Sequence, residues 1–295
     1  MINWNLSYAL FPVVIMFVIL IMNEDVSPKR MFSVFTISML SALPTAFIEM
    51  MGSWLLTAIY IDAGLDLYAH YPLVQTSYSA IIAFVVVALT EESFKLISFQ
   101  MVANKIHDVY SAIIYGATAA LGFAAIENIL YVVSAERFSI IVAGFRAVLS
   151  IPVHTVTGII IGLAFVNDGR RKTSDKIILF TMCVMLHGTY DFLLETIKDY
   201  ADNNFMVLTC LAGLGTIILI TYALLISLIV AMKRRHKIDR KVHLLQVPST
   251  TEIGDKTEII ESKTETIESN EMIVNYDDTN SLSNTNDRLS MSGSK

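Results

Sequence analysis

Residues 205–232 read FMVLTCLAGLGTIILITYALLISLIVAM, an apolar run without a single Asp, Glu, Lys or Arg. A helix of about 20 apolar residues crosses the ~30 Å hydrocarbon layer of a bilayer. Six further runs precede this one, at about 6–22, 31–59, 76–104, 110–134, 139–166 and 177–197. The sequence therefore predicts an all-α, polytopic bundle of about seven membrane spans within residues 1–243. The second, third and fifth runs are long, so we expect tilting, extension into the interface, or kinks at Pro44 or Pro152.

Composition excludes a soluble globular protein. Residues of the set AVILMFWYC make up 54% of the chain and only 16% are charged, against about 45–50% and about 25% in soluble domains. No basic stretch is interleaved with aromatic residues, so nucleic acid is not an expected partner. Cys183 and Cys210 lie in apolar segments and form no CxxC pair, which indicates buried hydrophobic residues rather than a disulfide or a thiolate metal site.

The distribution of Lys and Arg predicts the orientation in the cell membrane. Two basic residues, Arg137 and Lys198, fall on one side. Thirteen fall on the other: Lys29, Arg30, Lys105, Arg170, Arg171, Lys172, Lys176, Lys233, Arg234, Arg235, Lys237, Arg240 and Lys241. We therefore expect the N-terminus outside and the C-terminal tail in the cytoplasm. The first ten residues lack Lys and Arg, which favours a retained first span over a cleaved signal peptide.

The C-terminal segment 244–295 differs from the rest of the chain. It is rich in Ser, Thr, Asn and Glu and has no apolar stripe, so we predict a disordered tail. Residues 247–295 hold 10 acidic and 4 basic side chains, which accounts for the whole net charge of −6. The membrane part is therefore neutral.

Several ionisable side chains fall inside the predicted spans. Each costs at least ~2.5–3.5 kcal/mol at mid-bilayer depth, so the default interpretation of such a residue is functional. These candidates are Glu49, Glu91, Glu92, Lys95, Glu127, Arg146, His154, His187 and Asp191.

The third span contains two adjacent carboxylates and one ammonium. Glu91 and Lys95 are spaced i,i+4 and Glu92 and Lys95 i,i+3, so all three lie within reach of one another on a helix. One ammonium cannot compensate two carboxylates, which leaves one Glu to find a further cation or metal, or to act as a general base toward water. The structural alternative is a Glu–Lys pair that joins two helices.

The fourth and fifth spans carry one candidate each. Glu127 shares a helix face with Phe123 and follows a stretch of small residues that permits close packing; the alternative is a carboxylate bonded to a nearby hydroxyl. His154 precedes Gly158 and Gly162 at i,i+4 spacing, which points its face into the bundle, where it is either functional or a satisfied structural histidine.

The sixth span pairs His187 with Asp191 at i,i+4, so that the carboxylate can fix the imidazole tautomer or both side chains can bind one ion. A purely structural His–Asp pair is the alternative. Arg146 lies nearer the outer face, and we expect it to snorkel or to pair with Glu49 or Glu136.

Together these groups are typical of a hydrolytic centre. Two histidines, His154 and His187, with one carboxylate, Glu127 or Asp191, satisfy the three-ligand requirement of catalytic zinc and leave a Glu as base. Without metal, the same set gives a Glu-activated water and histidines that stabilise the oxyanion.

The pattern resembles the PrsW family of intramembrane proteases, which is distantly similar to the CAAX-processing and bacteriocin-processing superfamily. The resemblance covers roughly residues 30–200 and rests on four motifs in order. These are Glu91-Glu92-Ser93-Phe94-Lys95, Phe123 through Glu127-Asn128, His154 before small residues, and His187 with Asp191. The wider superfamily has His where Glu127 stands and Asn where Asp191 stands, and the extra carboxylates favour a metal-bound version.

The resemblance implies hydrolysis of membrane-anchored proteins, with anti-sigma factors as the representative bacterial substrates. Glu91 or Glu92 would activate water, His154 and His187 would bind metal or the oxyanion, and Glu127 and Asp191 would bind or orient. Lys95 would set the charge of the Glu pair. Two other classes of protein are alternative interpretations of the same residues. One is a proton-coupled transporter with a polar relay, and the other is a scaffold with a structural polar network.

Overall fold

The computed structural model describes residues 4–22, 26–65, 72–103, 105–135, 139–167, 169 and 171–246. All regular structure in these residues is helical. The elements are α1 (Trp4–Ile21), α2 (Pro28–Asp62), α3 (Pro72–Ile81), the π-helix η1 (Ile82–Ala88), α4 (Leu89–Ala103), α5 (Val109–Ser134), α6 (Ser139–Val148), α7 (Ser150–Phe165), α8 (Thr173–Asp199) and α9 (Asn204–Gln246).

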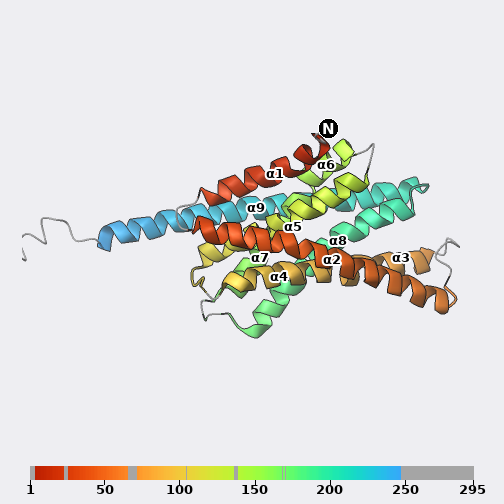
Figure 1. Cartoon of the computed structure of the whole chain (residues 1–295), viewed down its shortest axis with the longest axis horizontal. Coiled ribbons are helices and arrows are strands. Elements are labelled where there is room, and N and C mark those ends of the chain that lie inside the picture. Colours follow the sequence, from red (N-terminus) through yellow and green to blue (C-terminus); the bar gives the residue numbers. More distant parts are fainter. Residues whose placement is uncertain are drawn as a thin grey trace, which may run out of the picture. The chain divides into compact units, whose positions relative to one another are not determined.

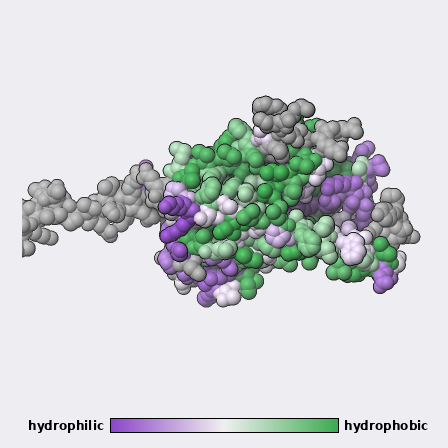
Figure 2. All heavy atoms as spheres, in the orientation of Figure 1, coloured by the Kyte–Doolittle hydropathy of each residue, from purple (hydrophilic) through white to green (hydrophobic). Residues whose placement is uncertain are grey.

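The predicted membrane bundle is confirmed. Among the described residues, six helical segments are long and apolar enough to cross a bilayer, and a shorter apolar helix over Leu10–Ile21 matches the first predicted span. The chain divides into two units, residues 1–230 and 231–295, and Figure 1 shows the first as a bundle of long helices. Its visible face is broadly hydrophobic, with hydrophilic residues gathered toward opposite ends (Figure 2). The predicted disordered tail lies almost wholly outside the described residues, since 247–295 are not among them.

Helix α5 lies in the middle of the bundle, and small residues allow its neighbours to approach it closely. Gly116 of α5 meets Gly158 and Gly162 of α7 so tightly that a Cβ on any of the three would clash with backbone atoms. Gly122 contacts the backbone of Phe35 on α2 in the same way. Small-residue contacts of this kind drive helix association in lipid, as predicted for the face that follows His154.

We expect Gly158→Val to destabilise the bundle, because the added side chain would meet the Gly116 carbonyl and the Ala120 methyl group. Overpacking of a tight contact costs about 1–3 kcal/mol. Thermal unfolding in detergent should show a clear drop in midpoint. Gly215→Ala in α9 is the matched control, since a Cβ there meets nothing within 4 Å; equal midpoints for the two variants would contradict this packing.

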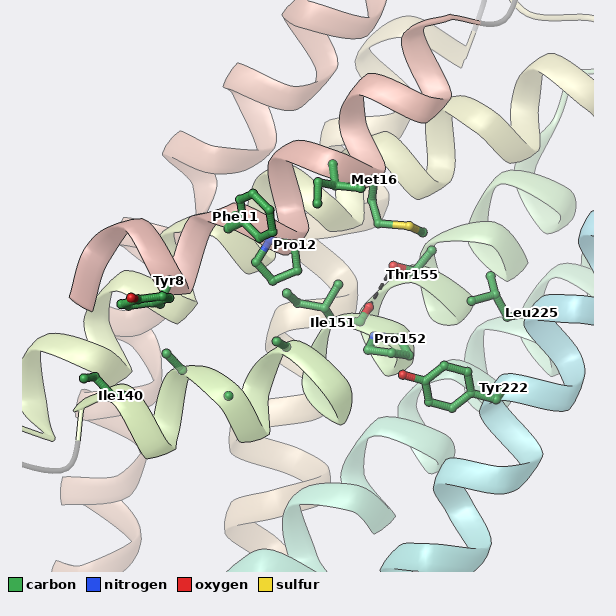
Figure 3. Close-up of a pocket in the computed structure, with 14 residues that line it drawn as sticks. Tyr8, Phe11, Pro12, Met16, Ile140, Ile151, Pro152, Thr155, Tyr222 and Leu225 are labelled. Carbon is green, nitrogen blue, oxygen red and sulfur yellow. Dashed lines mark hydrogen bonds between the residues drawn. The ribbon is translucent and has the colours of Figure 1, made fainter. Parts of the chain in front are cut away.

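The fifth predicted span is broken into α6 and α7 at Leu149. Pro152 has no N–H, so the Val148 carbonyl four residues earlier loses its helical donor. Tyr222 of α9 supplies a replacement, because its hydroxyl donates to that carbonyl at 3.0 Å. Figure 3 shows Pro152 and Tyr222 on the wall of an apolar cavity of about 560 Å³ between α1, α6, α7 and α9. In contrast, α2 continues through Pro44 as one element.

The third span has a π-helical stretch, η1, directly before the acidic motif of α4. Such stretches rotate the following helix relative to a regular α-helix and occur often at functional sites. Phe84 of η1 packs where a Cβ on Gly188 of α8 would stand. The glycine beside His187 therefore brings α8 close to this span.

Candidate active site

Helix α4 presents three ionisable side chains to the interior of the bundle. Lys95 Nζ lies 2.8 Å from Glu92 Oε1 and 3.3 Å from Glu91 Oε2. All three side chains are buried. The local pairing predicted from the i,i+3 and i,i+4 spacings is confirmed.

His154 on α7 is held through both ring nitrogens. Lys95 Nζ donates to Nδ1 at 2.7 Å, and an ammonium can only donate, so Nδ1 is the unprotonated nitrogen. The hydrogen of the neutral ring is therefore on Nε2, which lies 2.7 Å from Glu127 Oε2 on α5. A carboxylate on one nitrogen fixes the imidazole tautomer and leaves the other nitrogen facing the polar cluster.

His187 on α8 repeats this arrangement with the nitrogens exchanged. Its Nδ1 lies 2.8 Å from Glu92 Oε1, which can only accept, so Nδ1 carries a hydrogen. Its Nε2 lies 3.2 Å from Asp191 Oδ2. The second nitrogen therefore either carries a hydrogen as well or shares a cation with that carboxylate.

Glu92 contacts these groups through one carboxylate oxygen. Its Oε1 accepts from Lys95 and His187 and also from the Thr157 hydroxyl of α7, at 3.2 Å. Three helices thus meet at one carboxylate oxygen. Its occupied position is suited to orienting neighbours rather than to contacting a substrate.

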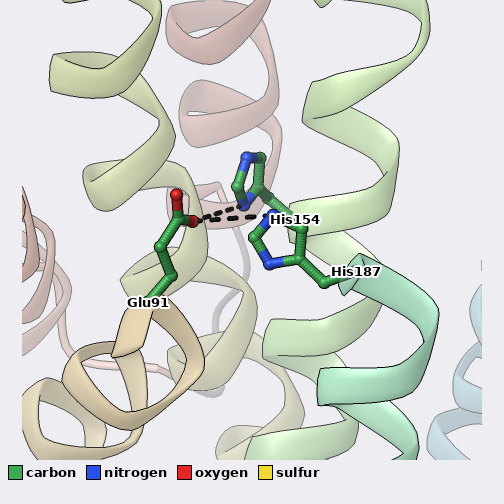
Figure 4. A group of neighbouring side chains, drawn as sticks. All are labelled: Glu91, His154 and His187. Carbon is green, nitrogen blue, oxygen red and sulfur yellow. Dashed lines mark ion pairs between the residues drawn. The ribbon is translucent and has the colours of Figure 1, made fainter. Parts of the chain in front are cut away.

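Glu91 lies between the two histidines, and its side chain points at both rings (Figure 4). Oε2 is 3.7 Å from His187 Nε2 and 3.9 Å from His154 Nδ1. It is buried, and no described residue hydrogen bonds to it. One ligand atom from each of Glu91, His154 and His187 lies within 4.8 Å of the others.

The donor set fits a divalent metal ion. Two nitrogens and one carboxylate oxygen are the ligands of a catalytic zinc site, and Glu127 and Glu92 occupy the outer positions that orient metal-binding histidines. The cluster contains four carboxylates, of Glu91, Glu92, Glu127 and Asp191, and two permanent cations, of Lys95 and Arg146. A bound divalent cation would offset this excess of negative charge, although Lys95 Nζ would then have to yield its contact with His154.

Arg146 is placed differently from the prediction. It neither snorkels nor pairs with Glu49; its Nη2 lies 2.6 Å from Glu127 Oε1 and its Nε donates to Asn128 Oδ1 at 2.6 Å. Glu136, the other predicted partner, lies outside the described residues. Glu49 on α2 is close enough to interact electrostatically with Glu91 and Glu127, and its Oε1 is buried without a hydrogen-bond partner among the described residues.

All seven predicted site residues therefore meet in one cluster: Glu91, Glu92, Lys95, Glu127, His154, His187 and Asp191. The carboxylate that lies within 4 Å of both histidines is that of Glu91, whereas the predicted ligand set contained Glu127. Sequence reasoning missed the roles of Arg146 and of Thr157, which bonds Glu92. The sequence signal that pointed to a role for Arg146 was its position inside a predicted span, eight residues before His154.

Comparison with known proteins identifies the same family that the sequence motifs resemble. Residues 27–228 match the model of the PrsW family intramembrane metalloprotease. The match extends further than the predicted 30–200 and includes most of the seventh span. No solved structure matches significantly.

Curated relatives named Protease PrsW are about one third identical to this chain over the aligned residues. The Oceanobacillus iheyensis protein is 33% identical over 141 residues, 45% of this chain and 64% of its own. The Clostridioides difficile protein is 34% identical over 122 residues, 38% and 51% of the two chains. The Bacillus subtilis protein is 35% identical over 95 residues, 31% and 42%. The chain thus spans about half the length of the relatives it matches. With most of its length matched to one family model, the chain belongs to the PrsW family of intramembrane metalloproteases.

Proposed function

We propose that this protein is an intramembrane endopeptidase that hydrolyses membrane-anchored proteins. The observation that carries the proposal is the buried Glu91 carboxylate oxygen Oε2, which lies within 4 Å of one nitrogen of each of two histidines and is paired with Lys95 at 3.3 Å. No described residue hydrogen bonds to this oxygen, whereas a purely structural network would give it a hydrogen bond, because a buried polar group without one costs free energy. Its position suits a group that acts on a water molecule or holds an ion.

The roles follow from the contacts. Glu91 works at the reacting centre, as ligand or as base toward water. Glu127 holds the hydrogen on Nε2 of His154, and Glu92 holds the hydrogen on Nδ1 of His187. The other ring nitrogens, Nδ1 of His154 and Nε2 of His187, therefore face Glu91. Asp191 orients His187, and Lys95 neutralises part of the Glu pair.

A divalent metal, with zinc as first candidate, would be held by Glu91, His154 and His187. When bound, it supplies Lewis-acid polarisation of the peptide carbonyl and a water of lowered pKa. Membership of a family of metalloproteases supports this assignment.

We further propose that the protein resides in the cell membrane with its N-terminus outside and its C-terminus in the cytoplasm. The excess of Lys and Arg on one set of loops supports this orientation. The resemblance to the PrsW family supports membrane-anchored proteins of the anti-sigma-factor class as substrates.

The test uses the purified full-length protein in lipid vesicles with a membrane-anchored reporter, whose cleavage products are measured by mass spectrometry. His187→Asn should lower cleavage by at least about 100-fold, the scale of losing one group that stabilises the transition state. It should also lose the bound zinc measured in the same preparation.

The matched control is His107→Asn, because His107 is exposed and contacts only the Asn167 carbonyl among the described residues. It should keep both cleavage and metal. Unchanged cleavage in His187→Asn would refute the proposed function. Lost cleavage with unchanged metal content would instead refute the metal assignment and favour water activated by Glu91 alone.

A further inference from the structure

Arg146 is the one arginine of the bundle interior among the described residues, and its side chain is only 8% exposed. Its guanidinium lies 4.0 Å from the centre of the Tyr131 ring. The same guanidinium contacts two neighbouring residues of α5: Nη2 contacts Glu127 Oε1, and Nε donates to Asn128 Oδ1. A planar guanidinium that contacts two oxygens fixes their positions better than a point charge does.

The break at Leu149 separates α6 from α7. Ala143, Gly144 and Ala147 of α6 line the apolar cavity of Figure 3. Arg146 lies about 60° from Ala143 and about 100° from Ala147 around the helix, so it stands at the flank of this apolar face. The same short helix therefore lines the cavity and brings a cation to Glu127.

The two oxygens of Glu127 have different partners. Oε1 meets Arg146, and Oε2 meets the Nε2 of His154 at 2.7 Å. If Arg146 is removed, the carboxylate can rotate and loses its main cationic partner. His154 then loses the acceptor that holds its hydrogen on Nε2.

We propose that Arg146, with Asn128, is a positioning residue: it fixes Glu127 so that Oε2 stays on Nε2 of His154 and the ring keeps Nδ1 facing Glu91. This inference rests on the proposed function for its effect on rate, but its effect on His154 stands independently. Arg146 does not itself touch the reacting atoms. None of the four sequence motifs includes it.

A double-mutant cycle tests the inference in the vesicle assay. Arg146→Gln should lower kcat about 10–100-fold, as expected for a residue that supports a metal-binding or catalytic histidine, with KM nearly unchanged. Arg146→Lys, which keeps the charge and guards against a folding failure, should recover part of the loss. In a Glu127→Gln background, Arg146→Gln should cost less than about 2-fold, because the two residues act as one unit.

A residue that merely braces α6 would give the same loss in both backgrounds, and that result would overturn the inference. Arg30→Gln, at an exposed arginine of α2, is the control and should leave kcat unchanged. A rise in KM with unchanged kcat after Arg146→Gln would also overturn it.

The second readout needs no activity. The ¹⁵N chemical shifts of histidine rings separate protonated from unprotonated nitrogens, and the His154 signals are identified by their loss in His154→Asn. Wild type should show a hydrogen on Nε2 that is bonded to Glu127, and Arg146→Gln should move the Nε2 shift toward that of a ring without this acceptor, while Lys95 keeps Nδ1 unprotonated. Unchanged His154 shifts would refute the positioning role even if the wild type cleaved no reporter, so this failure is distinct from failure of the proposed function.

Discussion

Replacing Glu91 by Gln is expected to abolish reporter cleavage while the bundle stays folded. The change keeps the size of the side chain and removes one negative charge from a cluster that has an excess of carboxylates. A neutral amide neither accepts a proton from water nor binds a divalent ion as a carboxylate does. Cleavage should therefore fall by at least about 100–1000-fold, the range for loss of a group at the reacting centre.

The stability of the same variant separates catalysis from folding. Glu91→Gln removes the ion pair of Glu91 Oε2 with Lys95 at 3.3 Å, but Lys95 keeps Glu92 at 2.8 Å and no hydrogen bond from a described residue is lost. The thermal unfolding midpoint should therefore stay close to that of wild type. Glu195→Gln, at an exposed residue that pairs with Lys198 on α8, is the control and should retain cleavage. Retained cleavage in Glu91→Gln would remove Glu91 from the reacting centre.

The sequence predicted the contacts that lie within one helix. Glu91 with Lys95 and His187 with Asp191 are four residues apart, and the fixed geometry of a helix turn brings them together whatever the rest of the fold does. The long apolar runs predicted the spans for the same reason. Helix length and helix periodicity are local properties.

Contacts between helices depend on crossing geometry, which no single span encodes. That Glu92 bonds His187, and that Glu91 lies within 4 Å of both histidines, depends on the close approach of α8 to η1 at Gly188. The contact of Arg146 with Glu127 joins α6 to α5, and the sequence of the fifth span alone does not specify which neighbouring helix lies there.

Lys95→Met should destabilise the protein more than any other single change in the cluster. Lys95 is wholly buried and contacts Glu91, Glu92 and His154. Removing one partner of a buried ion pair costs about 3–5 kcal/mol, because the remaining charge is left uncompensated. We expect a large fall in folded yield and in unfolding midpoint, measured in detergent. Lys198→Met should cost at most about 1 kcal/mol, since its ammonium pairs with Glu195 at the surface.

The double variant Lys95→Met with Glu92→Gln tests whether the buried Lys95–Glu92 ion pair serves stability or catalysis. Removing both charges removes the uncompensated carboxylate, so the double variant should regain much of the stability that Lys95→Met loses. Its cleavage should remain absent, because Nδ1 of His187 no longer faces the Glu92 carboxylate and His154 has lost the ammonium on Nδ1. Recovered stability together with recovered cleavage would mean that the pair serves only to hold helices together. Recovered stability without cleavage would mean that a buried ion pair is kept at this depth for the chemistry of the two histidines.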